Sequence, residues 1–275
     1  MPDDLIAEKS AAGTPSADAG RAAVPEATAA SHAVDTATGA EAEAQVSMDR
    51  ARSIFTKIAR RYSLFNALSS FGIYKVWLRR TVKRAQAKPT DEVLDLAAGT
   101  GDVTYRICRD TPPARIACTD FTPAMLDIAK SRQVAESNGV PLEFMVVDAQ
   151  DIPYPDESFD LVTIAYGIRN IPDREKALSE AYRVLRPGGR FVILEFSTPS
   201  NPVWRVLYHA YLNVMIPFIG GLLTHDRPGF VYLKNSINAF PDQEGLASLL
   251  RAAGFDRVTY ENCTGGITAI HQAIK

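Results

Sequence analysis

Residues 93–102 read Val93-Leu94-Asp95-Leu96-Ala97-Ala98-Gly99-Thr100-Gly101-Asp102, and this stretch decides the fold. Its apolar first half is typical of a buried strand, its two glycines indicate a tight turn, and a helix-like run follows. Glycines in such a turn let the backbone pass close to a ligand. Ligands of open α/β sheets bind beyond the carboxyl ends of the strands. We therefore predict a binding site at Gly99 and Gly101.

Strand-like and helix-like runs alternate through the rest of the chain after residue 91. Alternation of this kind predicts a doubly wound, Rossmann-like α/β fold, with a mostly parallel seven-stranded sheet and helices on both faces. Pro123 after Thr122 is typical of a helix start, and Asn138-Gly139 of a helix end. The expected strands are Val93–Ala98, Arg115–Asp120, Glu143–Asp148, Leu161–Ala165, Arg190–Phe196, Arg257–Glu261 and Ile267–Ile274. The expected helices are Val103–Arg109, Pro123–Ser137, Arg174–Leu185 and Gln243–Ala253.

The chain divides into three regions by composition. Residues 1–47 are rich in alanine, contain no aromatic residue and carry eight acids against two bases, which predicts a disordered acidic tail. Residues 48–90 form a basic region with helical periodicity, interrupted by Ser69-Ser70-Phe71-Gly72. Residues 91–275 form the α/β domain, with an apolar insert at 200–228. That insert contains His209, Pro217 and a glycine pair, and is too interrupted to indicate a membrane span.

Targeting and cysteine usage favour a bacterial cytoplasmic protein. The acidic tail is unlike a transit peptide and lacks the apolar stretch of a secretory signal. The three cysteines, Cys108, Cys118 and Cys263, form no CxxC pair and no zinc spacing, so we expect reduced thiols and no metal site.

Charge is segregated along the chain. Residues 48–90 carry eleven Lys or Arg and one acid, Asp49. A basic block beside apolar residues favours an anionic surface, and with the apolar insert it predicts a peripheral face at the inner side of the membrane. A solvated helix face and an ordinary helical subdomain are the alternatives. A homodimer is compatible with the sequence, which leaves the oligomeric state open.

Three acids at strand ends identify the ligand class. Asp95 ends the first strand, where it would repel a pyrophosphate but attract the ammonium and sulfonium of S-adenosylmethionine (SAM). The third glycine of the dinucleotide fingerprint is replaced by Thr104. We therefore expect SAM in place of NAD. Asp120 would then accept from the ribose hydroxyls, and Asp148 from the exocyclic amine of adenine.

Other side chains near these strand ends complete the predicted SAM site. Phe121 and Met125 are placed to pack on adenine, beside Asp148-Ala149. Thr104, near the start of the first helix, is expected at the methionine end.

Further motifs lie along residues 50–275. They are Phe55-x-x-Ile58-Ala59-x-x-Tyr62-x-x-x-Asn66, Ser70-Phe71-Gly72, Tyr166-Gly167-Ile168-Arg169-Asn170, Leu194-Glu195-Phe196-Ser197 and Tyr260-Glu261-Asn262-x-Thr264-Gly265-Gly266-Ile267. With these motifs the sequence resembles the ubiquinone/menaquinone biosynthesis C-methyltransferases, a family of class I SAM-dependent methyltransferases. Two departures from many members are Ala98, where Gly or Cys is common, and Ala165, where some have Ser.

This resemblance implies methylation of a ring carbon of a polyprenylated quinol in menaquinone or ubiquinone biosynthesis. Demethylmenaquinol is the expected substrate. Arg169 and Asn170 are implied to position the quinol oxygen and stabilise its charge, and Glu195 is one candidate base. Contacts with the substrate are expected from Tyr62, Asn66, Phe71 and His209; His209 and His271 are further candidate bases.

Two other functions remain open at this point. A methyltransferase acting on RNA or a small phenol would use the basic block as its electrostatic footprint. That block has few aromatic residues arranged for base stacking, so we expect no nucleic-acid partner. A non-catalytic SAM-binding subunit of a quinone pathway would also contain the cofactor motifs.

Overall fold

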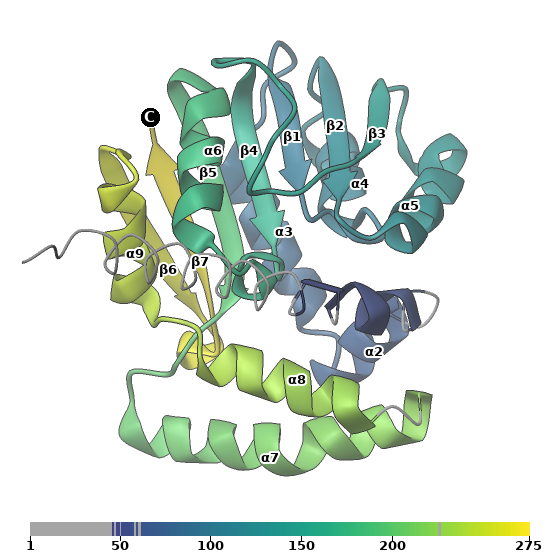
Figure 1. The fold of residues 1–275 in the computed structure, drawn as a ribbon, viewed down its shortest axis with the longest axis vertical. Helices are drawn as coiled ribbons and strands as arrows, with labels where there is room; N and C mark the ends of the chain where they lie inside the picture. The colour runs from purple at the N-terminus through teal and green to yellow at the C-terminus, as the bar shows by residue number, and fades with distance from the viewer. Residues whose placement is uncertain (1–45, 47, 50, 58, 60–61, 225–226) are drawn as a thin grey trace, which may run out of the picture. The chain divides into compact units, whose positions relative to one another are not determined.

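A computed structural model provides the structure of the protein (Figure 1). It describes the chain from residue 46 onward except residues 47, 50, 58, 60–61 and 225–226. The side chains of residues 62–63, 65, 215–224 and 227–230 are also outside the description. The tail predicted at residues 1–47 therefore lies almost entirely outside the described residues. Every described residue belongs to one unit, Glu43–Lys275.

Seven strands form one sheet in the order β3-β2-β1-β4-β5-β7-β6. The paired neighbours are parallel except at β7, which is antiparallel to β5 and β6. Strand β1 pairs with β2 on one side and β4 on the other, so the switch point lies at β1 and β4. This arrangement confirms the predicted fold. The strands are β1 Glu92–Leu96, β2 Arg115–Asp120, β3 Leu142–Val146, β4 Phe159–Ala165, β5 Leu185–Phe196, β6 Arg257–Cys263 and β7 Thr268–Ile274.

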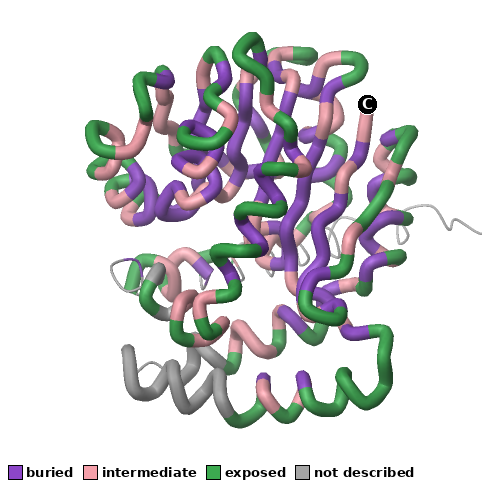
Figure 2. The backbone as a smooth tube through the Cα atoms, turned by 180° about the vertical axis from the view of Figure 1, so that it is seen from behind, coloured by how far each residue is buried: buried purple, intermediate pink, exposed green. Residues whose placement is uncertain are grey.

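Helices cover both faces of the sheet because its strands are apolar on both sides. Along β1, Leu94 packs in one core with α6 and α9, while Val93 packs in a second core with α3 and α4. Figure 1 shows α6 in front of the sheet and α3 behind it, and Figure 2 shows the inner strands of the sheet as largely buried. The helices are α2 Tyr62–Ser69, α3 Tyr74–Ala85, α4 Asp102–Asp110, α5 Pro123–Glu136, α6 Arg174–Val184, α7 Pro202–Thr224, α8 Arg227–Asn238 and α9 Gln243–Ala252, with short 3-10 helices η2 Ile168–Asn170 and η3 Thr264–Gly266.

Every strand end lies within two residues of the predicted one except the start of β5. Strand β5 begins at Leu185, five residues before the predicted start at Arg190. The Gly188 N–H donates to the Lys275 carbonyl and the Lys275 N–H to the Gly189 carbonyl, so the end of the chain pairs with the glycine pair. Strand β3 ends at Val146, which leaves Asp148 just beyond the sheet. The start of β5 and the end of β3 depend on pairing with distant parts of the chain, which the local sequence does not reveal.

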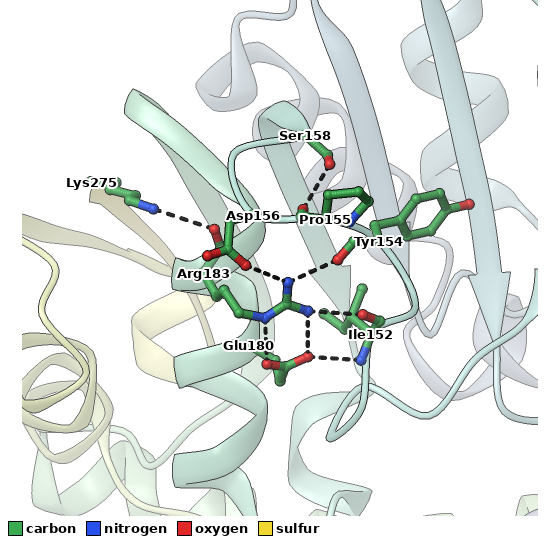
Figure 3. Close-up of polar contacts among 8 residues, drawn as sticks. All are labelled: Ile152, Tyr154, Pro155, Asp156, Ser158, Glu180, Arg183 and Lys275. Carbon is green, nitrogen blue, oxygen red and sulfur yellow. Dashed lines mark hydrogen bonds and ion pairs between the residues drawn. The ribbon is translucent and has the colours of Figure 1, made fainter.

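Arg183 on α6 holds the loop between β3 and β4 (Figure 3). Its guanidinium donates to the carbonyls of Ile152 and Tyr154 at 2.8 Å each, and to Asp156 at 2.9 Å. Glu180 accepts from the same guanidinium at 2.7 and 2.8 Å and from the Ile152 N–H at 2.9 Å. Charge-assisted bonds of this kind are about twice as strong as neutral ones. They fix the loop that begins with Asp148.

The apolar insert forms α7, which packs with α8 across the carboxyl ends of the parallel strands (Figure 1). The first part of α7 is amphipathic: Tyr208 and Leu212 are buried, while Val203 and Val206 are more than two-thirds exposed. Among the described residues, no helix is both long enough and apolar enough to cross a membrane.

Candidate active site

The turn after β1 depends on glycine at two positions for different reasons. Gly101 has φ +83°, and a β-carbon there would lie 2.7 Å from the Tyr105 ring, so only glycine fits. Gly99 has φ +58°, and a β-carbon there would meet only Met125, at 3.8 Å. The Gly99 N–H donates to Asp120 Oδ2 at 2.8 Å. The turn therefore links the ends of β1 and β2, and leaves the backbone at Gly99 open to a ligand.

Asp95 is fully buried beneath this turn. It accepts from Thr104 Oγ1 at 2.6 Å and from Thr163 Oγ1 at 2.7 Å. Burial raises the pKa of Asp95 to about 6, although both threonine hydrogen bonds oppose the shift. Thr104 was predicted at the methionine end of SAM. In the structure Thr104 is itself fully buried and its hydroxyl proton is directed at Asp95, so it orients the carboxylate behind the site.

The other predicted cofactor residues come together around one cavity. Asp120 is 8% exposed and accepts from the Thr122 N–H at 2.7 Å. Burial raises its pKa, and the backbone hydrogen bonds act against this. Asp148 is held by the backbone N–H of Gln150 at 2.9 Å. The predicted residues that line the cavity are Gly99, Asp120, Phe121, Met125, Asp148, Ala149 and Asn170.

A helical segment at residues 51–57 supplies one wall of this cavity, which the sequence did not indicate. Arg52 donates to the Phe121 carbonyl through Nε at 3.3 Å and Nη2 at 3.1 Å. The same guanidinium lies 4.0 Å from the centre of the Phe121 ring, a cation–π distance. Met48 and Phe55 line the cavity beside Arg52. The basic character of the region was visible in the sequence, but its docking on Phe121 is a long-range contact.

A second cavity, of about 290 Å³, lies between the sheet and helices α2, α3, α7 and α8. Its walls are largely aromatic and aliphatic. Two of the four predicted substrate residues, Asn66 and Phe71, line it. The aromatic lining residues that were not among the predicted substrate contacts are Phe55, Tyr74, Trp77, Tyr166, Phe196, Trp204, Tyr208, Tyr211 and Tyr232.

The other two predicted substrate residues have different outcomes. His209 is half-buried on α7, and its neighbours Leu207 and Tyr208 line the cavity in its place. The side chain of Tyr62 lies outside the described part of the chain, so its predicted role stays a prediction. Trp77 Nε1 and Trp204 Nε1 both donate to Thr264, at 2.9 and 3.0 Å, and so tie α3 and α7 to η3.

Tyr166 separates the two cavities and lines both. It has φ +56°, a conformation uncommon for a side chain of this size. Gly167 follows it, and a β-carbon there would lie only 2.5 Å from the Ala97 β-carbon. The loop after β4 is thus packed tightly against the turn after β1. This contact places η2, with Arg169 and Asn170, beside the cofactor cavity.

Arg169 and Glu195 form a buried ion pair at the boundary of the two cavities. Arg169 Nη1 donates to Glu195 Oε1 at 2.7 Å, and the two side chains are 3% and 1% exposed. Burial raises the pKa of Glu195, and the charge of Arg169 opposes that shift. Arg169 lines the larger cavity. Glu195 lies behind it and also accepts from the Phe196 N–H at 2.8 Å, which places it to hold Arg169 and not as a base facing the substrate.

The third candidate base, His271, lies within the sheet on β7. It is 2% exposed, and its Nε2 is 2.8 Å from the Gln243 carbonyl. Burial lowers its pKa. The structure thus brings none of Glu195, His209 and His271 to the wall of the substrate cavity. Over the described stretches, no three His, Cys, Asp or Glu side chains gather in a way that could hold a metal ion.

The residues of the smaller cavity fit SAM. The glycine turn leaves room above Gly99, and the carboxylates of Asp120 and Asp148 face the same space. Asn170 also lines it, and its Oδ1 is buried without a hydrogen-bond partner among the described residues. A buried acceptor without a partner indicates a missing donor, which the ligand can supply. Bound SAM supplies an electrophilic methyl group on a cationic sulfur.

The fold and this site define a class I methyltransferase that uses SAM as its methyl donor. Among solved structures, a possible histamine N-methyltransferase of Thermotoga maritima aligns with TM-score 0.58 and 20% identity, over 81% of this chain and 98% of that one. The YcgJ protein of Bacillus subtilis aligns with TM-score 0.53 and 19% identity, over 72% of this chain and 97% of that one. These likenesses concern the fold alone.

The chain belongs to the ubiE/COQ5 methyltransferase family, whose model matches residues 43–275. Relatives named ubiquinone/menaquinone biosynthesis C-methyltransferase UbiE are similar over most of their length. The protein of Francisella tularensis subsp. novicida is 38% identical over 227 residues, which cover 82% of this chain and 91% of that relative. The protein of Stutzerimonas stutzeri is 39% identical and covers 82% and 89%. The resemblance predicted from the sequence motifs is confirmed.

Proposed function

We propose that this enzyme methylates a ring carbon of a polyprenylated quinol, and that demethylmenaquinol is its substrate. The observation that carries the proposal is the pair of adjoining cavities that share Tyr166 and Phe55. One fits SAM, and the other is apolar and lined by aromatic side chains, with Arg169 at the boundary. The printed names of the relatives support a quinone pathway and include both quinones.

In this reaction the enzyme must make a carbon nucleophilic. A quinol ring carbon becomes nucleophilic when a neighbouring hydroxyl loses its proton, and a fixed cation favours that charge. Arg169 is held in place by Glu195 and by the Tyr166 carbonyl, so its guanidinium is oriented before substrate arrives. We assign it to the quinol oxygen. Asn170 lies on the cofactor side of the same short helix and positions the ring against the methyl group.

Methyl-labelled SAM and two reduced acceptors with short prenyl tails test this function directly. One acceptor is demethylmenaquinol and the other is the methoxy-benzoquinol of the ubiquinone pathway. Label in the naphthoquinol alone supports the proposal, and label in both makes the enzyme a dual-pathway one. Transfer to neither acceptor, with SAM binding intact, would overturn the proposal and favour an RNA or small-phenol substrate, or a non-catalytic subunit.

We further propose that the mouth of the larger cavity docks on an anionic membrane. Phe71 and Leu207 line the cavity and are also 74% and 55% exposed. Val76, Val203 and Val206 extend this apolar surface over α3 and α7, whose exposed first part is shown in Figure 2. Helix α3 beside it contains five Lys or Arg and no acid, and Lys75, Arg79 and Lys83 are exposed. Apolar side chains beside exposed bases suit an anionic lipid surface.

Vesicle binding tests this surface. The protein should sediment with vesicles that contain anionic lipid, and high salt should release part of it because exposed charges are screened. A Phe71→Ser/Val206→Ser variant should bind less, while Val134→Ser, which changes a fully exposed valine on α5, should not. Equal loss in both variants, or equal binding to neutral vesicles, would contradict the proposed face.

A further inference from the structure

The position of Tyr208 on the inner side of α7 is fixed by packing. Tyr208, Leu212 and Ile237 form a small core between α7 and α8, against Phe196 and Ile267. Tyr208 is 4% exposed and lines the larger cavity together with Arg169. Its ring therefore belongs to the cavity wall and cannot turn out to solvent.

The hydroxyl of Tyr208 is buried and has no hydrogen-bond partner among the described residues. Leaving a buried donor unpaired destabilises the folded state. Tyr211 is one turn further along the same helix, lines the same cavity and donates to the Ser69 carbonyl. The two tyrosines line the same cavity, but their hydroxyls differ in hydrogen bonding. The Tyr211 hydroxyl is bonded within the protein, whereas the Tyr208 hydroxyl has no partner among the described residues and is free to bond a ligand.

The charges that act on the Tyr208 hydroxyl are those of Arg169 and Glu195. Burial raises the pKa of Tyr208; the Arg169 charge acts against this and the Glu195 charge adds to it. The phenol is therefore protonated at neutral pH and is available as a donor. It stands beside the guanidinium already assigned to the quinol oxygen.

We propose that the Tyr208 hydroxyl donates a hydrogen bond to a ring oxygen of the quinol, so that α7 supplies a second donor beside Arg169. This inference rests on the proposed function, because a quinol ring oxygen is the acceptor. Two donors aimed at one developing oxyanion stabilise it more than one does, and a water-excluded cavity increases their effect. Helix α7 of the apolar insert would then both contact the substrate and, through Tyr208, stabilise the charge that develops on the ring oxygen.

Replacing the tyrosine by phenylalanine removes the hydroxyl and preserves the ring. In Tyr208→Phe we expect kcat with the quinol to fall by about 10²–10³-fold, the loss typical of one oxyanion donor. The acid limb of the pH–rate profile should move to higher pH, since the quinolate is less stabilised. The affinity for SAM should not change. The melting temperature should stay the same or rise, because an unpaired buried hydroxyl has been removed.

Tyr211→Phe is the matched control. It removes a hydroxyl that is already bonded within the protein, so it should leave the acid limb where the wild type has it, whatever its effect on rate. A Tyr208→Phe variant that keeps its rate within threefold, or a Tyr211→Phe variant with the same pH shift, would overturn the inference. Wild-type turnover of the quinol is measured in parallel. Its absence refutes the proposed function and this inference together, while a normal Tyr208→Phe rate refutes the inference alone.

Discussion

Asp95→Asn should make the protein more stable and lower its affinity for SAM. The Asp95 carboxyl has an ordinary pKa of 3.8, which burial raises to about 6 in the folded chain. Folding therefore takes up a proton between these values, and the free energy of unfolding falls as pH rises through this window. At about 1.4 kcal/mol per pKa unit, the ionised carboxylate destabilises the folded protein by about 3 kcal/mol at pH 7.

An asparagine at position 95 can keep both local hydrogen bonds. Its amide oxygen accepts from one of the hydroxyls of Thr104 and Thr163, and its amide group donates to the other once that hydroxyl turns. Loss of the charge-assisted bonds costs about 1 kcal/mol. We therefore expect the free energy of unfolding of Asp95→Asn to exceed that of the wild type by about 2 kcal/mol at pH 7. At pH 5 this difference should be smaller by about 1.3 kcal/mol, because the wild-type carboxyl is then mostly protonated in the folded state. SAM should bind at least about tenfold more weakly, because its cationic end loses a counter-charge.

Urea unfolding at pH 5 and pH 7 measures the first effect, and titration calorimetry with SAM measures the second. Asp91→Asn is the matched control, since Asp91 precedes the same strand and pairs with Arg190. It should destabilise the protein and leave SAM affinity unchanged. An Asp95→Asn variant that is less stable than the wild type by the same amount at both pH values would contradict the raised pKa of Asp95.

Three further changes have clear expected results. Arg169→Met should destabilise the protein by about 3–5 kcal/mol because it leaves the Glu195 charge buried without its ion-pair partner; combining it with Glu195→Leu should restore most stability but no turnover, as denaturation and label transfer would show. Gly167→Ala should cost about 1–3 kcal/mol and slow turnover, because the new β-carbon overlaps the turn after β1; Gly139→Ala, with φ +77° and open space around it, should cost about 1 kcal/mol in a melt and keep the turnover rate. Arg52→Ala should raise the Michaelis constant for SAM about tenfold with little change in kcat, since it loosens only the cofactor wall; steady-state rates at varied SAM would check this.

The cofactor site could largely be predicted from the sequence because its chemistry is local. Asp120 and Asp148 follow strands whose apolar runs are visible, and parallel strands bring their carboxyl ends to one edge of the sheet. Gly99 and Gly101 are required by backbone conformations that few other residues adopt. Each of these residues could be placed from its immediate neighbours, and all but Gly101 line the cavity as expected.

The wall around the substrate could not be predicted in the same detail. Arg52 reaches Phe121 across 69 residues, and Trp77 reaches Thr264 across 187. The apolar character of α7 was evident, but His209 was selected because of its chemistry, while the packing of α7 on α8 turns Tyr208 and Tyr211 inward. Hydrophobic periodicity predicts that a helix has a buried side. It does not predict which polar atom on that side is left without a partner.

The ion pair with Arg169 changes the role that Glu195 can have in the site. A carboxylate at a strand end beside the site was a reasonable candidate base, but Arg169 lies between it and the cavity and neutralises it. The pair has no net charge, and its cationic member is the one that faces the substrate. In the proposed reaction Arg169 therefore stabilises the neutral quinol little and the quinolate that forms from it strongly. Interactions that strengthen only as charge develops accelerate the reaction, whereas equal binding of both forms does not.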